Sequence, residues 1–513
     1  MVSPKVPDQT EDGPPSTRDL RARLATGTIW IAAARLSANL LGLTTSLLLA
    51  RMLAPADFGL VAFGMTILWV VSAVTNMSLS QALIQHRAPT PAHFQTAWTL
   101  NAARGFLVAL FLCLAAKPAA LIAHEPRLFT LMCVLALGPI LDGFQNPRTI
   151  MLVRNLIFRQ QFALQVGAKL TGLVVSVAFA LAYKTYWALV LGALAGQAAG
   201  LVISYLLFPF RPRLNLEHYR ELFAFSLWLT LGDVVLALNL KFDSLLIGQF
   251  LGRAPLGVYT VGDNLAVLPT KEAMTPVMST LFPALSNLVH DRGRLGAAYQ
   301  RAQTLVTAAA LPAGIGLGLI ADPLIRLTMG DKWLGAIVVV QILTLVYSIM
   351  TLAMLAQSIA MAAGETRLLF KRDLQGFLIS APTVGLGMFF GGLMGILYVR
   401  IFLAGVGILL NMQVVKHVSG LSILGQLTAN ARALVSVIAM TLAVLAVIQV
   451  APMGHTAPAL VASIALRIVV GVLTYLLSTT ALWLLQGRPG GPEDELLRFA
   501  GRLWARRRVA QLD

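Results

Sequence analysis

Long apolar runs, separated by short polar breaks, extend along nearly the whole chain. A helix needs about 20 mostly apolar residues to cross a bilayer. Charged, proline and glycine positions divide the chain into fourteen such runs, expected near 27–50, 57–82, 94–116, 128–150, 162–183, 186–208, 223–251, 257–285, 300–321, 334–363, 374–391, 393–415, 431–452 and 457–485. The pattern predicts an all-α polytopic membrane protein with about 14 transmembrane helices.

Composition excludes the soluble and disordered classes. Of the 513 residues, 57% are hydrophobic and only 12% are charged, whereas soluble domains carry about 25% charged residues. The two cysteines, Cys113 and Cys133, fall inside expected spans. We therefore expect neither a disulfide framework nor a metal site.

The net charge of +17 arises from 39 Lys and Arg against 22 Asp and Glu. With the N-terminus inside, 25 of these cations fall in cytoplasmic segments, seven in outer segments and seven within the spans. Cytoplasmic loops are enriched in Lys and Arg, so both termini are predicted to be cytoplasmic. Most of the charge thus reflects topology, and no nucleic-acid partner is expected.

An internal repeat relates the first and seventh expected helices. Residues 47–59 recur, shifted by 198 positions, at 245–257, and Gly59 and Gly64 match Gly257 and Gly262. An even number of helices separates the copies, which predicts two parallel six-helix lobes followed by two C-terminal helices. Chance similarity between apolar helices remains the alternative. The expected units are a disordered cytoplasmic tail (1–26), an N-terminal lobe (27–210), a C-terminal lobe (211–415), two additional helices (416–486) and a cytoplasmic amphipathic tail (487–513).

Charged side chains within the expected spans are the candidates for function, because a charge at the bilayer centre costs at least about 2.5–3.5 kcal/mol. Ion pairing between helices would explain several of them. Arg35, Lys169 and Arg400 lie close enough to an expected interface to reach the headgroups. The cations are Arg35, Arg104, Lys169, Lys241, Lys271, Arg400 and Arg467, and the acids are Asp142, Asp233, Asp243, Asp263 and Glu272.

Small and polar residues recur at helical spacing along four of the expected helices. Such rows also occur where membrane helices pack together, but four of them, spread over both halves, favour a shared polar cavity. The rows are Arg35, Asn39, Gly42 and Ser46; Gly138, Asp142, Gln145 and Thr149; Ser226, Thr230, Asp233, Ala237, Lys241, Ser244 and Gly248; and Asp263, Ala266, Thr270, Ala273, Val277 and Thr280.

Motifs of nucleotide-dependent and metal-dependent enzymes are missing from the sequence. There is no phosphate-binding Walker A loop and no HExxH zinc motif. The outer loops are about a dozen residues or shorter, too short for the catalytic domain that a membrane polymerase or ligase would need. These absences argue against an enzyme, and we expect no cofactor. The parallel repeat is instead a construction known from secondary transporters.

Three stretches resemble the polysaccharide repeat-unit flippases. They are residues 241–252 with the following Leu256-Gly257-Val258-Tyr259, the turn from Leu49 to Gly59, and Phe282-Pro283-Ala284-Leu285-Ser286. In this order, they are similar to the Wzx-like oligosaccharide branch of the multidrug/oligosaccharidyl-lipid/polysaccharide (MOP) exporter superfamily. The resemblance covers most of residues 25–485, and the C-terminal helix pair exceeds the minimal twelve-helix pattern.

The resemblance implies two six-helix lobes that move undecaprenyl-pyrophosphate-linked oligosaccharide to the periplasmic leaflet of a bacterial inner membrane by alternating access. A polysaccharide polymerase and export machinery are the protein partners it implies, and exopolysaccharide or lipopolysaccharide synthesis is the pathway class. Relatives are thought to couple to an ion gradient, for protons or sodium.

On this basis we assign attraction of the pyrophosphate to Arg35, Arg104, Lys241 and Lys271, and ion coupling to Asp233, Asp263 and Asp142. Two other functions compete. A multidrug exporter of the same superfamily would show an acid-dominated cavity, and a polysaccharide polymerase or ligase would show a large periplasmic loop.

Overall fold

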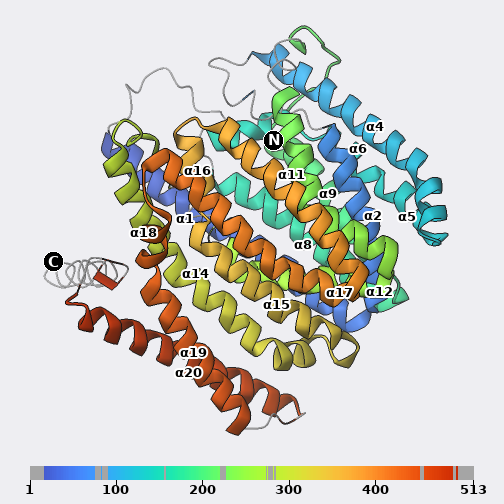
Figure 1. The fold of residues 1–513 in the computed structure, drawn as a ribbon. Coiled ribbons are helices and arrows are strands. Elements are labelled where there is room, and N and C mark those ends of the chain that lie inside the picture. Colours follow the sequence, from blue (N-terminus) through green and yellow to red (C-terminus); the bar gives the residue numbers. More distant parts are fainter. Residues whose placement is uncertain are drawn as a thin grey trace, which may run out of the picture.

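The computed structural model describes residues 17–75, 83, 90–154, 158–219, 227–272, 274, 281, 285–450, 454, 456–488, 491, 493 and 494. All regular elements among them are helices (Figure 1). The first half contains α1 (Thr17–Met52), α2 (Pro55–Val74), α4 (Pro91–Ile122), α5 (Arg127–Leu135), α6 (Leu137–Gly143), η1 (Pro147–Thr149), α7 (Ile150–Arg154), α8 (Phe158–Tyr183) and α9 (Trp187–Leu207).

The second half begins with α11 (Leu227–Leu246), which runs into a π-helical turn, η2 (Ile247–Leu251). It continues with α12 (Arg253–Val267), η3 (Leu268–Glu272), α14 (Arg292–Thr328), η4 (Asp331–Trp333), α15 (Gly335–Met350), η5 (Thr351–Ala353), α16 (Ala356–Ala362) and α17 (Thr366–Ser419). Three further helices complete the described chain: α18 (Ile423–Ala429), α19 (Ala431–Val450) and α20 (Ala457–Leu485).

Helix starts follow local sequence signals. Pro55 and Pro91 stand in the first turns of α2 and α4, where a missing backbone N–H has no cost because that group would be unpaired anyway. At α2, a carboxylate oxygen of Asp57 also accepts a hydrogen bond from the amide of Ala54 at 3.1 Å. Pro55 and Asp57 therefore define where α2 begins after the short turn that follows α1.

The expected spans correspond to the observed helices. Within the described residues, eleven helices are long and apolar enough to cross a membrane, and α17 contains two of the expected spans. The span expected at 128–150 is broken into α5 and α6. The span expected at 257–285 is described as α12 and η3 up to Glu272, and most of its remainder lies outside the described residues. Helix α1 begins at Thr17 and so overlaps the predicted tail of residues 1–26.

Helix α17 is a hairpin of two helices. Gly392 interrupts it with a backbone conformation of φ 56° and ψ −134°, which a residue without a Cβ adopts readily. The two arms of α17 fold back on each other, since Arg372 of the first arm donates a hydrogen bond to Oδ1 of Asn411 in the second arm at 2.9 Å. A straight helix would hold these residues about 58 Å apart. The expected break at Gly391-Gly392 is confirmed.

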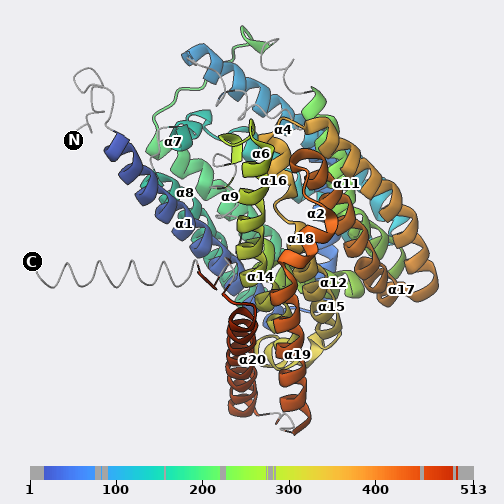
Figure 2. The ribbon, with the colours of Figure 1, turned by 60° about the vertical axis from the view of Figure 1, so that its left-hand side comes forward.

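Helices α19 and α20 form an additional pair at the edge of the molecule, where both pack against α14 (Figures 1 and 2). Arg467 of α20 donates a hydrogen bond to the carbonyl oxygen of Leu319 at 3.0 Å, and Tyr475 donates to that of Ala308 at 2.8 Å. The expected amphipathic tail after α20 lies almost entirely outside the described residues.

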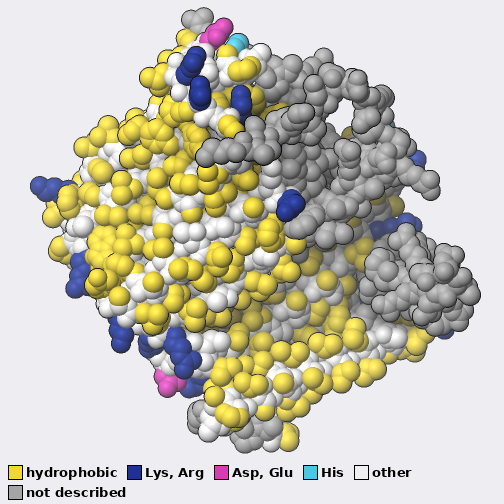
Figure 3. Space-filling view, turned by 180° about the vertical axis from the view of Figure 1, so that it is seen from behind, with side chains coloured by type: hydrophobic (Ala, Val, Ile, Leu, Met, Phe, Trp, Pro, Cys, Tyr) yellow, Lys and Arg dark blue, Asp and Glu magenta, His cyan; other side chains and the backbone are white. Residues whose placement is uncertain are grey.

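The surface of the bundle is apolar. Figure 3 shows a face covered mainly by hydrophobic side chains, with Lys and Arg mostly toward its margins. Large side chains such as Phe389, Phe390 and Leu206 are 76–81% exposed. Soluble monomers seldom expose apolar patches on this scale, whereas lipid requires them. The chain is a multi-pass membrane protein.

The repeat predicted from the sequence lies at the contact between the two halves, where α2 packs against α12. A Cβ added to Gly59 would lie 1.7 Å from the carbonyl oxygen of Arg253, and one added to Gly257 would lie 1.8 Å from that of Pro55. The shift of 198 residues relates Gly59 to Gly257 and Pro55 to Arg253. The contact is therefore reciprocal, as an approximate two-fold axis requires, and larger residues would force the helices apart.

Candidate functional site

A cavity of about 910 Å³ lies between the two halves of the molecule, and we call it the central cavity. It is lined by α1, α2, α8, α9, α11 and α12. Among the α1 residues that line it, exposure falls from Arg35, which is exposed, to Leu49, which is 1% exposed. The cavity thus ends toward the C-terminus of α1, beside Leu49 and Phe58, and we call this its closed end.

Three cations line the central cavity against one carboxylate. Arg35, Lys169 and Lys241 come from α1, α8 and α11, and the acid is Asp263 of α12. None of the three cations forms an ion pair within the described part of the chain. The described lining therefore carries a net positive charge, an arrangement that attracts anions.

Lys241 also contacts an aromatic ring from the opposite half of the molecule. Its ammonium nitrogen lies 5.3 Å from the ring centroid of Trp69, which belongs to α2. This distance allows a cation–π interaction. The contact holds the Lys241 side chain at the boundary between the halves.

Arg104 is in a different place from the other predicted cations. It lines a second cavity of about 610 Å³, which we call the side cavity, together with Asp142. Arg104 donates a hydrogen bond to the carbonyl oxygen of Ser72 at 3.2 Å, and Gln145 donates one to Asp142 at 3.2 Å. The structure thus brings Arg35 and Lys241 together and adds Lys169, but it separates Arg104 from them. The side chains of Lys271 and Asp233 lie outside the described part of the structure.

The predicted polar rows do not all face the same cavity. All four members of the α1 row line the central cavity, whereas the row of α6 and η1 is divided, with Gln145 in the central cavity and Asp142 in the side cavity. On α12, Asp263 faces the cavity but Ala266 is fully buried, and so is Thr270 of η3, which packs toward Gly314 of α14. That part of the row serves helix packing, the alternative use of small residues in membranes.

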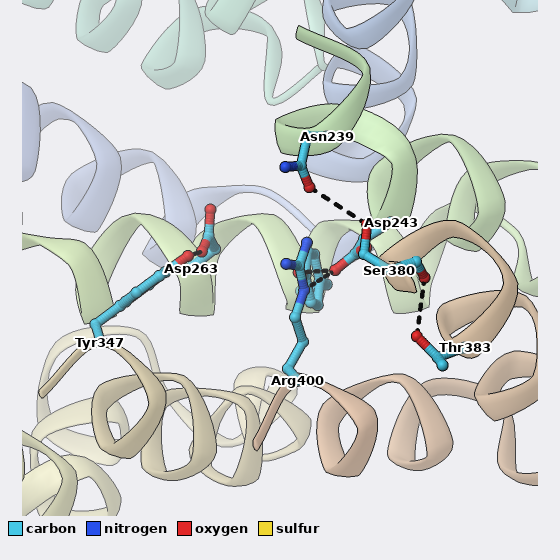
Figure 4. Close-up of polar contacts among 8 residues, drawn as sticks. Asn239, Asp243, Asp263, Tyr347, Ser380, Thr383 and Arg400 are labelled. Carbon is cyan, nitrogen blue, oxygen red and sulfur yellow. Dashed lines mark hydrogen bonds and ion pairs between the residues drawn. The ribbon is translucent and has the colours of Figure 1, made fainter. Parts of the chain in front are cut away.

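A buried polar network connects three helices beside the central cavity (Figure 4). Asp243 of α11 is only 2% exposed and pairs with Arg400 of α17, and it accepts a hydrogen bond from the hydroxyl of Tyr259 at 2.8 Å. Arg400 was expected to reach toward lipid headgroups. Its position on the second arm of the α17 hairpin turns it inward instead, and pairing with Asp243 compensates the burial of both charges.

Asp263 has a partner of its own. The hydroxyl of Tyr347, from α15, donates a hydrogen bond to Oδ1 of Asp263, and Figure 4 shows the two side chains pointing toward each other. Since Asp263 also lines the central cavity, this carboxylate connects the cavity to the interior of the second half. Sequence spacing could not reveal this contact, because Tyr347 lies 84 positions away.

At the closed end of the cavity, side chains of the second half donate hydrogen bonds to backbone carbonyls at the end of α1, in the first half. Trp333 donates a hydrogen bond to the carbonyl oxygen of Ala50, and Lys332 donates one to that of Arg51, each at 2.7 Å. The last carbonyls of a helix have no intrahelical partner, so η4 of the second half satisfies those of α1. Partial burial lowers the pKa of the Lys332 ammonium, and the nearby Asp57 carboxylate opposes this shift.

A second set of contacts is related to the first by the repeat. Arg51 donates to the carbonyl oxygen of Leu327 at 3.0 Å, and its repeat equivalent Gln249 donates to that of Ile122, also at 3.0 Å. Arg253 adds an ion pair with Glu125 at 2.9 Å. Two equivalent sets of contacts therefore hold the closed end, and we call each set a latch. The first joins the end of α1 to α14 and η4, and the second joins η2 and the start of α12 to the end of α4 and the segment between α4 and α5. In the sequence, only the internal repeat pointed to these contacts.

The sequence matches a known protein family. Residues 48–338 match a family model described as polysaccharide biosynthesis protein. Lipopolysaccharide biosynthesis protein WzxC of Escherichia coli (strain K12) is 24% identical over 385 residues, which cover 74% of this chain and 77% of WzxC. Succinoglycan biosynthesis transport protein ExoT of Rhizobium meliloti (strain 1021) is 26% identical over 308 residues; these cover 59% of this chain and 62% of ExoT, less than two thirds of its length.

Among solved structures, the fold is similar to that of the lipid II flippase MurJ in an inward closed conformation. The TM-score is 0.71 at 15% identity, and the superposition covers 90% of this chain and all of the MurJ chain. At this identity the likeness shows a shared fold.

Proposed function

This chain belongs to the polysaccharide biosynthesis protein family, and on that premise we propose that it is a flippase for lipid-linked oligosaccharides. The substrate that we propose is an undecaprenyl-pyrophosphate-linked oligosaccharide, moved from the cytoplasmic to the periplasmic leaflet of a bacterial inner membrane. The names of WzxC and ExoT place those proteins in polysaccharide synthesis and transport, and that of MurJ describes a flippase.

The observation that carries this proposal is the charge of the central cavity. Among the described lining residues, Arg35, Lys169 and Lys241 face one carboxylate, Asp263, which leaves two positive charges to meet a pyrophosphate. Hydrogen bonds between charged groups contribute about 1.5–3 kcal/mol each. A cationic drug would be repelled by the same cavity, so the arrangement favours a flippase over a multidrug exporter.

An apolar cavity supports a lipid-linked substrate. About 650 Å³ in volume, it lies between α1, α12, α14, α19 and α20. Arg467 is the one charged residue in its lining within the described part of the chain, and its guanidinium is bonded to a backbone carbonyl. Helix α1 lines both cavities, with Ser46 on the polar side and Leu47 on the apolar side. A polyprenyl chain and its charged head group would thus each find a matching surface.

Removal of single cavity cations tests the proposal. Flipping of a fluorescent undecaprenyl-pyrophosphate-linked sugar is measured in vesicles that contain the purified protein. We expect Lys169→Ala and Lys241→Ala each to lower the apparent affinity by about 10- to 150-fold, the equivalent of one lost charged hydrogen bond. Lys117→Ala, which removes an exposed lysine of α4 away from both cavities, is the matched control. If both cavity variants retain the wild-type affinity, the cationic cavity does not bind the pyrophosphate.

We further propose that Asp263 couples flipping to a proton or sodium gradient. It is the one carboxylate among the described residues that line the central cavity, and its bond to Tyr347 reaches α15. A cation that binds there in place of the Tyr347 contact would alter packing between α12 and α15. Asp263→Asn should make the flipping rate independent of an imposed gradient, whereas Asp331→Asn, at an exposed position of η4, should not. A gradient-dependent Asp263→Asn variant would exclude this residue as the coupling site.

A further inference from the structure

The side cavity adjoins the central cavity and is separated from it by three shared side chains. Met65 and Trp69 of α2 and Gln197 of α9 line both cavities. The side cavity otherwise lies among α2, α4, α6 and α11. At about 610 Å³, it has the size of a small-molecule site, which is typically about 300–1,000 Å³.

The two cavities differ in charge. The side cavity holds one cation, Arg104, and one carboxylate, Asp142, with the amide of Asn101 close by. Counting the described lining residues, its formal charge is therefore zero, whereas that of the central cavity is +2. A group with several negative charges belongs in the central cavity. A neutral group rich in hydroxyls suits the side cavity, because carboxylate, guanidinium and amide groups supply both donors and acceptors.

Arg104 has hydrogen-bonding capacity that the protein does not use. Its Nη2 bonds to the carbonyl oxygen of Ser72, but Nε has no hydrogen-bond partner within the described part of the structure. It forms no ion pair with Asp142 there, although both line the same cavity. A half-buried guanidinium with an unused donor is costly unless a ligand or water completes its bonding.

Trp69 stands where the two cavities meet. Its side chain is 54% exposed, and the Lys241 ammonium lies 5.3 Å from the ring centroid. The apolar face of a sugar ring, which presents C–H groups, packs well on an indole. In a glycosyl pyrophosphate the first sugar is bonded directly to the phosphate. A phosphate held by Lys241 would therefore place that sugar beside Trp69.

We propose that the side cavity is the sugar subsite of the transporter, with Trp69 as the stacking surface and Asp142, Arg104 and Asn101 as partners of a neutral hexose. The inference rests on the proposed function, because the central cavity must hold the pyrophosphate. It assigns Asp142 and Arg104 to sugar recognition rather than to ion coupling or pyrophosphate attraction. The substrate would then be divided between two cavities of matching charge.

Binding of two lipids to the full-length protein in lipid nanodiscs tests this subsite. One is undecaprenyl pyrophosphate and the other is the same lipid carrying a single glucose. We expect wild-type protein to bind the glucosylated lipid about tenfold or more tightly, since it makes additional hydrogen bonds. Asp142→Asn should remove most of this advantage and leave the affinity for the sugar-free lipid within twofold. Trp69→Ala should also remove most of the advantage, measured as the ratio of the two affinities, because its contact with Lys241 can change the binding of both lipids. Trp69→Phe, which retains an aromatic face, should restore most of it.

The outcomes separate the two proposals. Wild-type protein that binds neither lipid would overturn the proposed flippase itself. Equal affinity for both lipids would overturn the sugar subsite and leave the binding of lipid pyrophosphate intact. Variants that weaken both lipids equally would also overturn the subsite, because the residues would then support the cavity as a whole. Asp142→Asn is nearly isosteric, so a loss confined to the glucosylated lipid, at an unchanged unfolding temperature, supports direct contact.

Discussion

The closed end of the central cavity offers a sharp test of how the lobes are held together. Trp333 is fully buried, contacts Phe58 edge to face at 5.2 Å, and donates its indole N–H to the carbonyl oxygen of Ala50. The usual partner of that carbonyl would be the amide of Ala54, but this amide bonds to the Asp57 carboxylate. In Trp333→Phe the carbonyl of Ala50 stays buried and loses its partner.

The expected magnitude follows from that loss. A buried acceptor left without a partner costs about 1–3 kcal/mol, and the cost applies only while the lobes are in contact at this end. When they separate, water can reach the carbonyl. The equilibrium should therefore move toward the state open at this end by about 5- to 150-fold. With the N-terminus cytoplasmic, as the distribution of cations predicts, this end faces the periplasm.

Accessibility of a cavity residue measures the shift. Ser46→Cys lines the central cavity and is introduced after Cys113 and Cys133 are replaced by Ala. In Trp333→Phe, a membrane-impermeant maleimide added from the periplasmic side should label this cysteine faster. Trp483→Phe is the matched control, because Trp483 is buried to a similar degree but lies on α20, away from the closed end. Unchanged labelling at equal protein level would refute the role of the latch.

Two further predictions concern stability, measured as the unfolding temperature in detergent. Arg400→Met and Asp243→Asn should each destabilise the protein by about 3–5 kcal/mol, since each leaves a buried charge without its partner. The double variant should lose much less stability than the sum of the two single losses. Additive losses would show that the two charges act independently. Gly257→Ala should cost about 1–3 kcal/mol or more, because the added Cβ would meet the carbonyl oxygen of Pro55 at 1.8 Å. Gly316→Ala of α14 has nothing within 4 Å of the added atom and should be neutral or slightly stabilising; an equal loss in both variants would contradict the close contact of α2 and α12.

Most of the fold could be predicted because lipid imposes a simple rule on sequence. Spanning helices must be long and apolar, so the positions of the spans, the break at Gly392 and the repeat that joins Gly59 to Gly257 were all visible in the chain. The polar row on α1 was visible for a related reason. Lipid does not favour small polar residues at helical spacing, and Arg35, Asn39, Gly42 and Ser46 do line the central cavity.

The candidate site was only partly visible, because helical spacing shows which residues share a face and not which neighbour that face meets. Arg104 and Lys241 carry the same charge in similar spans, yet they face different cavities. Lys169 and Arg400 both lie near an expected interface. One faces the central cavity, and the other is paired with Asp243, 157 positions earlier in the chain.

The sequence by itself determined a multi-pass helical protein with two related halves, since hydrophobicity and repetition are properties of the chain alone. Only the tertiary structure decided how its buried charges are used. Whether a cation lines a cavity, pairs with a carboxylate or holds a latch depends on which helices lie next to each other. That arrangement depends on side-chain packing between residues far apart in the chain, such as Trp333 on Ala50 and Tyr347 on Asp263.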